Sequence, residues 1–200
     1  ARGEYLLFLN NDVEIITGSW LEEMLQLCQQ KDVGMVGAKL YYPDDTIQHA
    51  GVVVGLGGVA AHVLCKLPRD AEGYMGRLRC VQEISAVTAA CMMVKTSVFK
   101  AVGGFDEELK VAFNDIDLCM KVRKYGVKIV FTPYAELYHY ESKSRGMEDT
   151  PEKQLRFSRE VNCFRRKWER ELLKGDPYYN PNLTLNNTDC SLRKQEKNGD

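Results

Sequence analysis

The chain has 200 residues, and 27 Lys and Arg side chains nearly balance 28 Asp and Glu side chains, for a formal net charge of −1. This balance gives no indication of a nucleic-acid partner, and the length is sufficient for one domain with a real core. Seven cysteines without a C-x-x-C pair argue against a zinc site or a disulfide framework and indicate a reducing compartment. No apolar run approaches membrane-spanning length.

The first element of the chain is an apolar run over 5–9, which ends in Asn10, Asn11 and Asp12. Such a run predicts a strand buried on both faces, as in a parallel sheet. Open α/β sheets bind ligands beyond the carboxyl ends of their strands, where a carboxylate can hold a divalent metal against a phosphate. The same three residues are equally typical of a turn. Because the run starts so early, without an initiating Met, we expect a fragment or an excised domain.

A helix and two strands are predicted next. Ser19 and Glu22 have the spacing of a capping box, and apolar residues then recur at helical spacing through Cys28. The residues that follow predict a strand over 33–42, a turn, and a returning strand over 47–54. The glycines at 55–58 predict a loop rather than a phosphate-cradling motif.

Strands and helices continue to alternate in the second half, which predicts an α/β fold. Asn114 is a suitable N-cap, so Asp115 is expected in the first turn of a helix, and His139 at the end of a late strand. The predicted elements are two short strands around a bend within 83–95, a helix over 96–102 capped by Thr96, a helix over 114–125, and strands over 127–132 and 135–140, separated by Pro133.

The C-terminal part differs in composition, and it sets the expected domain boundaries. Residues 152–174 are strongly charged but carry an apolar stripe at helical spacing, which favours a helix packed on the domain. We therefore expect a main domain over 1–150 and a charged helix with an extended segment over 151–185. The polar residues 186–200 are expected to be disordered.

Asp12, Asp115 and His139 all lie at ends of predicted elements, where sites form. A carboxylate and an imidazole suit Mn²⁺ or Mg²⁺, with substrate phosphates completing the coordination. A second carboxylate clear of the metal could act as a general base. The structural alternatives are a helix-dipole partner for Asp115 and a core histidine for His139. His49 and His62 are expected to be structural.

Several motifs in a fixed order make the sequence resemble the second half of a family 2 glycosyltransferase with the GT-A fold, of the bacterial polysaccharide and rhamnosyltransferase-like kind. The resembling stretches are 5–12, 45–51, 85–91, 103–107, 113–119 and 139–146, with 176–183 similar to a segment that often follows such domains. The resemblance implies a mixed sheet with flanking helices that lacks the N-terminal nucleotide-binding strands. It also implies an inverting transfer from a nucleotide-diphosphate sugar to a glycan or lipid-linked acceptor.

Carried over residue by residue, the resemblance implies a role for each matching position. Asp115 would be the catalytic base, and Asp12 and His139 would bind Mn²⁺ or Mg²⁺. The donor would meet Asn10, Asn11, Asp12, Ala89 and Arg145, and the acceptor would meet Gly104, Asp106 and Asn114.

Two positions depart from the family pattern. Asn10 replaces the first aspartate of the D-x-D motif, and Ala89 stands where relatives usually have glycine. With the family's nucleotide-base pocket also missing, a non-catalytic module that binds carbohydrate or a partner protein is the main alternative. A nucleotidyltransferase is a weaker one. The expected location is cytoplasmic, with peripheral association at the inner face of the cell membrane.

Overall fold

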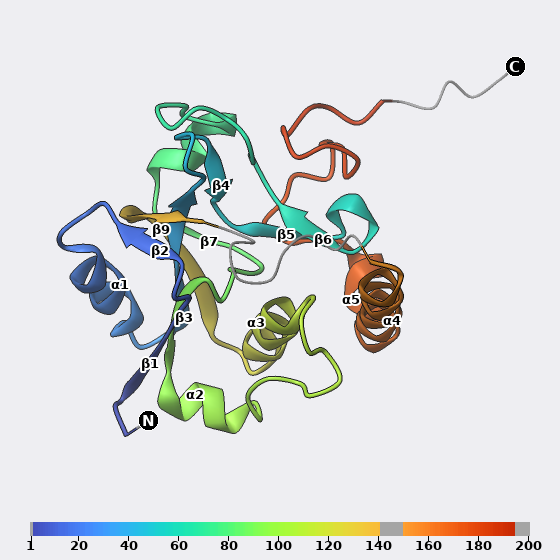
Figure 1. Cartoon of the computed structure of the whole chain (residues 1–200), viewed down its shortest axis with the longest axis horizontal. Helices are drawn as coiled ribbons and strands as arrows, with labels where there is room; N and C mark the ends of the chain where they lie inside the picture. Colours follow the sequence, from blue (N-terminus) through green and yellow to red (C-terminus); the bar gives the residue numbers. More distant parts are fainter. Residues whose placement is uncertain (1, 141–149, 195–200) are drawn as a thin grey trace, which may run out of the picture.

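A seven-stranded mixed sheet with helices on both faces forms the centre of the computed structural model, which describes residues 2–140 and 150–194 (Figure 1). The strand order is β1-β8-β3-β9-β2, with β4 paired to β3 and β7 paired to β9. A separate two-stranded sheet contains β5 and β6. The strands are β1 (Tyr5–Leu9), β2 (Val13–Ile15), β3 (Val33–Tyr41), β4 (Ile47–His49), β5 (Val52–Val54), β6 (Ala60–His62), β7 (Gln82–Glu83), β8 (Cys91–Lys95) and β9 (Lys128–His139).

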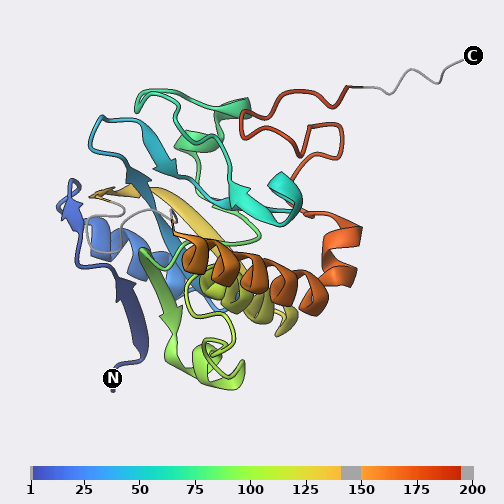
Figure 2. The same ribbon diagram turned by 45° about the vertical axis from the view of Figure 1, so that its right-hand side comes forward.

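Helices cover the sheet unequally. Figure 1 shows α1 on one side of the sheet and α3 with α4 and α5 on the other, and Figure 2 shows α4 running alongside α3. The helices are α1 (Trp20–Cys28), α2 (Thr96–Ala101), α3 (Asn114–Lys124), α4 (Pro151–Lys167) and α5 (Glu169–Lys174), with short 3₁₀ turns η1 (Leu56–Gly58) and η2 (Tyr74–Arg79).

Two apolar cores lie on opposite faces of the sheet. Every residue of β3 is buried, and its alternating side chains serve both cores: Met35 contributes to the one under α3 and Val36 to the one under α1. On α1, Met24 and Cys28 are fully buried at a spacing of four residues. Burial of each large apolar side chain contributes about 1.5–3 kcal/mol to stability. Because β3 is buried along its whole length and serves both cores, it is the central strand of the fold.

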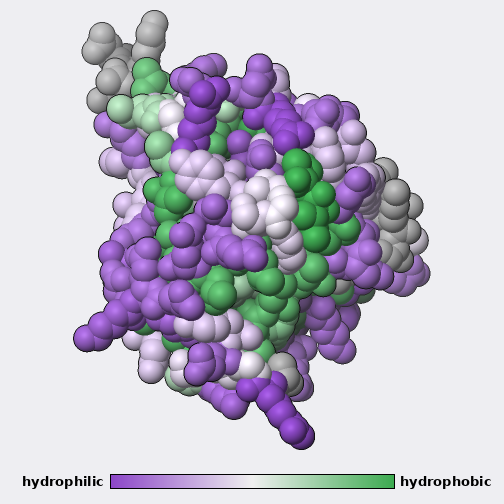
Figure 3. Space-filling view, turned by 90° about the vertical axis from the view of Figure 1, so that its left-hand side faces the viewer, coloured by the Kyte–Doolittle hydropathy of each residue, from purple (hydrophilic) through white to green (hydrophobic). Residues whose placement is uncertain are grey.

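Strand β1 lies at the edge of the sheet. Among the described residues it pairs with β8 alone, in antiparallel register with Leu7 opposite Met93. Its side chains are half-buried, and Leu9 is 42% exposed. Figure 3 views the molecule from the side of α1 and β1 and shows apolar surface among polar side chains. The strand prediction is confirmed, but the parallel, doubly buried setting is wrong, because an apolar run does not encode its number of neighbours.

Local chain geometry corrects four further expectations. Ser19 precedes α1 but makes no side-chain capping bond, and Lys95, not Thr96, is the N-cap residue of α2. The returning strand breaks into β4 and β5 because Gly51 has φ +103°, a conformation that favours glycine. Strand β9 runs through Pro133, where its pairing with β3 shifts register instead of ending.

The C-terminal part packs on the sheet domain. The predicted single helix is α4 and α5 separated at Trp168, and both Phe164 and Trp168 belong to the core under α3. The predicted disorder of 186–200 is wrong for 186–194, because Leu64 donates its backbone N–H to Thr188 O (2.6 Å) and Cys190 is buried. Residues 195–200 lie outside the described part.

Candidate functional site

Asn10, Asp12 and His139 meet at one edge of the sheet because β2 folds back onto β9. The two strands are antiparallel with Val13 opposite His139, which brings the loop after β1 over the end of β9. Asp12 Oδ1 lies 3.3 Å from His139 Nε2, and the Asn10 amide nitrogen lies 3.1 Å from the same Nε2 atom. The structure therefore brings together the strand-end residues that the sequence suggested.

Gln48 on β4 fixes the orientation of the His139 ring. Its amide nitrogen donates to the backbone oxygen of His139 (3.1 Å), so its side-chain oxygen faces Nδ1 at 2.7 Å. Nδ1 then donates a hydrogen bond to the Gln48 oxygen, and in the tautomer that carries its proton there Nε2 is the acceptor of the Asn10 amide N–H. This is the arrangement in which a metal-binding histidine is usually held by a neighbouring acceptor.

The facing atoms of Asp12 and His139 fit a divalent cation. Asp12 Oδ1 is buried without a hydrogen bond, and Nε2 opposite it is also an acceptor in the tautomer with its proton on Nδ1. Two lone pairs aimed at one another need a cation or a proton between them. Within residues 2–140 and 150–194 no group of three or more His, Cys, Asp or Glu side chains converges on one point. A cation at this pair would therefore complete its coordination with substrate oxygens and water.

Asp115 lies in the first turn of α3, as predicted. The helix begins at Asn114, one residue earlier than an N-cap role for Asn114 would give, because Phe113 is the cap residue with φ +62°. Asn114 Oδ1 instead accepts a hydrogen bond from the Asp115 backbone N–H (2.7 Å). The carboxylate of Asp115 accepts from Ile116 N–H (2.9 Å) and from Ala89 N–H (3.1 Å).

The Ala89-Ala90 backbone connects Asp115 to the Asp12–His139 pair. Ala89 donates to Asp115 on one side, and Ala90 O accepts from the Asn10 backbone N–H at 3.0 Å on the other. Asn10 in turn contacts His139. The carboxylate on α3 and the pair at the sheet edge are therefore connected by hydrogen bonds through Ala89, Ala90 and Asn10.

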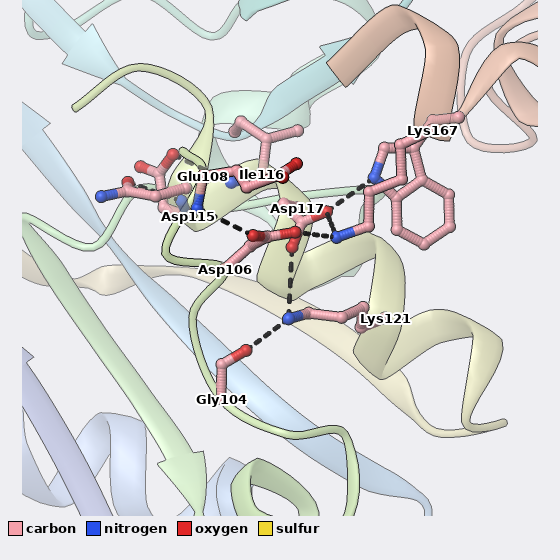
Figure 4. Close-up of polar contacts among 10 residues, drawn as sticks. Gly104, Asp106, Glu108, Asp115, Ile116, Asp117, Lys121 and Lys167 are labelled. Atoms are coloured by element: carbon pink, nitrogen blue, oxygen red, sulfur yellow. Dashed lines mark hydrogen bonds and ion pairs between the residues drawn. The ribbon is translucent and has the colours of Figure 1, made fainter. Parts of the chain in front are cut away.

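A buried ion-pair cluster holds the loop before α3 against α3 and α4 (Figure 4). Asp117 is fully buried; its Oδ1 accepts from Trp168 Nε1 (2.8 Å) and lies 2.7 Å from Lys167 Nζ. The Lys121 ammonium lies 3.2 Å from Oδ2 and also donates to Gly104 O. Lys167 makes a second ion pair with Asp106. One carboxylate thus ties α3 to the α4–α5 junction and to the Gly104–Asp106 turn.

The predicted acceptor-side residues already have internal bonds. One Asp106 oxygen accepts from Glu108 N–H (3.0 Å), the other pairs with Lys167, and the Lys167 contact lowers the pKa of the Asp106 carboxyl. Gly104 O is held by Lys121. These contacts shape the loop. Among the side chains of the predicted acceptor residues Gly104, Asp106 and Asn114, the Asn114 nitrogen has no hydrogen-bond partner in the described residues.

Glu160 was missed by the sequence analysis and anchors the same loop. It is 4% exposed, and its carboxylate accepts from the backbone N–H groups of Lys110 (3.2 Å), Val111 (3.3 Å) and Ala112 (2.7 Å). Its position on the charged helix α4 looked like a solvated one. Gln48, Asp117 and Lys167 were also missed; the i,i+4 spacing of Asp117 and Lys121 was the one sequence signal for this cluster.

The remaining predicted residues lie apart from the site or outside the description. His49 and His62 contact one another through their Nδ1 atoms at 2.9 Å, and His49 is fully buried, in keeping with a structural role. Arg145 lies outside the described residues. Within the described part of the chain, no helix is both long and apolar enough to cross a lipid bilayer.

The sequence of residues 1–160 matches the model of a glycosyltransferase-like family. The chain belongs to this family. It is 57% identical over 193 residues to the protein y4gI of Sinorhizobium fredii, and 41% identical over 201 residues to the O-antigen biosynthesis protein RfbC of Myxococcus xanthus. These alignments cover 96% and 100% of this chain but 21% and 15% of those relatives, so the chain spans about a fifth of their length or less.

Solved glycosyltransferases show that the fold of this family member is GT-A. The mannosyltransferase PcManGT of Pyrobaculum calidifontis, in complex with GDP-Man and Mn²⁺, superimposes with a TM-score of 0.53 at 15% identity, over 85% of this chain and 40% of that one. GalNAc-T7 with UDP, GalNAc and Mn²⁺ gives a TM-score of 0.59 at 13% identity, over 86% of this chain and 33% of its own. The predicted mixed sheet with flanking helices is confirmed.

Proposed function

We propose that this chain carries the reaction centre of an inverting glycosyltransferase, which moves a sugar from a nucleotide-diphosphate sugar to a hydroxyl group of a glycan or related acceptor. The observation that carries the proposal is the pairing of Asp12 Oδ1 with His139 Nε2, connected through Ala89 and Ala90 to the carboxylate of Asp115. The two solved structures add support, since one is a complex with GDP-Man and Mn²⁺ and the other a complex with UDP, GalNAc and Mn²⁺.

Asp12 and His139 are the residues that would hold Mn²⁺ or Mg²⁺ in this proposal. The bound ion would supply Lewis-acid stabilisation of the departing diphosphate. Asn10 orients the imidazole by donating to Nε2 when no ion is bound, and Asn11 with the Ala89 backbone would line the donor side. Arg145, outside the described residues, is proposed to meet the phosphates.

Asp115 is the proposed general base. Its two backbone hydrogen bonds fix the carboxylate and use one lone pair of each oxygen, so the remaining lone pairs can accept the proton of an attacking hydroxyl. Asn114 precedes Asp115 in the sequence, and its side-chain nitrogen is suited to donate a hydrogen bond to the same acceptor substrate. Gly104 and Asp106 would act through the shape of their loop.

The setting we propose is polysaccharide assembly. One relative is named for O-antigen biosynthesis, and another, 36% identical over 62 residues, is a Mycobacterium tuberculosis rhamnosyltransferase that acts on a diphospho-decaprenol. A glycan or lipid-linked acceptor, and work in the cytoplasm at the inner face of the membrane, are consistent with those names.

The test is Asp115→Asn in the longest native form of the protein, with release of nucleoside diphosphate from GDP-mannose, UDP-N-acetylglucosamine and dTDP-rhamnose measured in Mn²⁺. We expect the transfer rate to fall by roughly 10²–10⁴, the usual contribution of a general base. Glu107→Gln, an exposed carboxylate nearby, is the matched control and should leave the rate unchanged.

Binding measurements separate the base role from the metal role. Asp12→Asn should abolish Mn²⁺-dependent nucleotide binding, whereas Asp115→Asn should retain it. Transfer at a near-normal rate in Asp115→Asn would remove the base assignment. If no nucleotide binds to the protein with Mn²⁺ present, the alternative of a non-catalytic carbohydrate- or protein-binding module would be favoured.

A further inference from the structure

A hollow of about 570 Å³ lies beside the β3–β4 hairpin, and it shares no lining residue with the candidate site. It is formed where the hairpin meets the segment that leads to η2, and Thr46 pairs with Pro68 across this contact. Its floor is made by Lys39 and Tyr41 of β3 and Glu136 of β9, with Arg69 beside them. Exposed carboxylates, including Asp44, Asp45 and Asp70, line its rim.

Lys39 is the unusual residue of this hollow. It is 5% exposed, yet among the described residues it forms no ion pair, and its ammonium group donates to Leu78 O alone (3.1 Å). An ammonium group has three donors, and lysines are almost never fully buried unless paired. The nearest carboxylate influence, Glu136, is already engaged by the Tyr41 hydroxyl and by Arg69 at 3.6 Å. The Lys39 ammonium therefore has a hydrogen bond to Leu78 O and lies over the Tyr41 ring (5.3 Å to its centroid), but within the described residues it has no carboxylate partner.

The charges of the floor and the rim differ in sign. Lys39 and Arg69 outweigh Glu136 at the floor, whereas the carboxylates are exposed at the rim, where solvent screens them. Of these, Asp45 is bonded to Tyr138 Oη and Arg69, and Asp44 accepts from Thr46 N–H (3.0 Å). Burial lowers the pKa of Lys39, and an anion in contact would oppose that effect.

We propose that this hollow binds an acidic saccharide unit, with its carboxylate or phosphate oxygens against Lys39 and Arg69 and its hydroxyl groups against the rim carboxylates. The oxyanion would provide the anionic partner that Lys39 lacks, and hydroxyl groups can donate to Asp44, Asp45 and Asp70. The site does not depend on the proposed transfer reaction, because none of its residues takes part in that proposal.

Calorimetric titration of the whole chain with four probes tests this site: D-glucuronate, D-glucose 6-phosphate, D-glucose and inorganic phosphate. We expect at least one acidic sugar to bind more tightly than glucose and phosphate. Lys39→Met should weaken that binding by at least about tenfold, since hydrogen bonds to charged groups are among the strong ones. Arg79→Gln at the rim, where the side chain is 60% exposed and paired with Glu72, should change it by less than about threefold.

Glu136→Gln provides a test of opposite sign that does not rely on Lys39→Met folding. Removing the one negative charge of the floor should tighten binding of the acidic sugar while keeping an acceptor for the Tyr41 hydroxyl. The proposal is overturned if neither acidic sugar binds below about 10 mM. It is also overturned if glucose or phosphate alone binds equally well, or if Lys39→Met and Glu136→Gln leave the affinity unchanged.

Discussion

At the scale of single residues, incomplete hydrogen bonding of a buried polar atom distinguishes Asp12 at the candidate site and His49 on β4. Asp12 Oδ1 and His49 Nε2 are both buried without a hydrogen bond in the described part of the chain. Such groups are costly in a folded protein unless a ligand, an ion or a proton satisfies them. For Asp12 we infer a ligand; for His49 the consequence is a dependence of stability on pH.

His49 predicts a loss of stability in mild acid. Its pKa is well below the ordinary 6.5, first because burial disfavours the charged imidazole and then because of His62 and His139. Above pH 6.5 the folded and unfolded forms are both neutral, so His49 has no effect there. As the pH falls below 6.5, the unfolded chain binds the proton first, and stability drops by up to about 1.4 kcal/mol per pH unit.

Urea unfolding at several pH values between 5 and 7.5 (roughly the window of histidine titration) would measure this effect. As the pH falls, the free energy of unfolding should decrease less steeply in His49→Gln than in the wild-type chain. The difference in slope should correspond to about one proton bound on unfolding. Carboxylates titrate equally in both proteins, so the difference isolates His49. Parallel curves for the two proteins would contradict the assignment.

At the scale of elements, strand and helix positions followed from apolar periodicity, but their neighbours did not. The run over 5–9 correctly predicted β1, because its residues are uniformly apolar and bounded by polar ones. Its edge position depends on which strand lies alongside, which is decided by residues 86 positions later in β8. The predicted returning strand is likewise interrupted at Gly51, where φ is positive, and the predicted C-terminal helix at Trp168, which belongs to the core under α3.

The positions of the candidate site residues along the chain could also be predicted from the sequence, but the residues that contact them could not. Asp12, Asp115 and His139 are polar residues at element ends, which sequence reasoning can recognise. Asp117 could not be recognised in the same way, because its partners Lys167 and Trp168 are about 50 residues away in the sequence. Pairing of distant elements, rather than secondary structure, is the part that the sequence left open.

Asp117→Asn tests whether the buried cluster joins α3 to the α4–α5 junction. The change leaves the ammonium groups of Lys121 and Lys167 without their shared carboxylate, so the free energy of unfolding should fall by about 3–5 kcal/mol. Asp106→Asn removes the other partner of Lys167. The Asp106 side chain is 22% exposed, so this change should lower the free energy of unfolding by about 1 kcal/mol. Urea denaturation followed by circular dichroism measures both; equal losses would show that Asp117 has no special role.

At the scale of the whole molecule, the sheet, both cores and the C-terminal helices form one support for a small number of polar groups. The loop over 103–113 is held from below by Lys121 on α3 and from the side by Glu160 and Lys167 on α4. This explains how helices with strongly charged sequences contribute to the site without containing the proposed catalytic residues. The charged side chains of these helices bind the loop over 103–113, and this loop positions the start of α3.

The same architecture limits how tightly this chain alone should bind metal. Asp12 and His139 would supply two ligands, whereas Mn²⁺ or Mg²⁺ usually has about six, so water or substrate oxygens would have to provide the others. We expect residues 1–200 to bind Mn²⁺ with a Kd of about 1 mM or weaker, measured by electron paramagnetic resonance of the free ion. His139→Ala should abolish this binding, and His49→Ala should leave it intact, since His49 faces His62 instead.

Nucleoside diphosphates then distinguish a metal site from a donor site. If the diphosphate completes the coordination, adding GDP or UDP should tighten Mn²⁺ binding in the longest native form of the protein, and do so less in residues 1–200, which span 15–21% of two relatives. Equal Mn²⁺ affinity in wild type and His139→Ala, with nucleotide present, would mean that the facing lone pairs of Asp12 and His139 share a proton. The Asp12–His139 pair would then be structural, and the reaction centre would have to lie elsewhere.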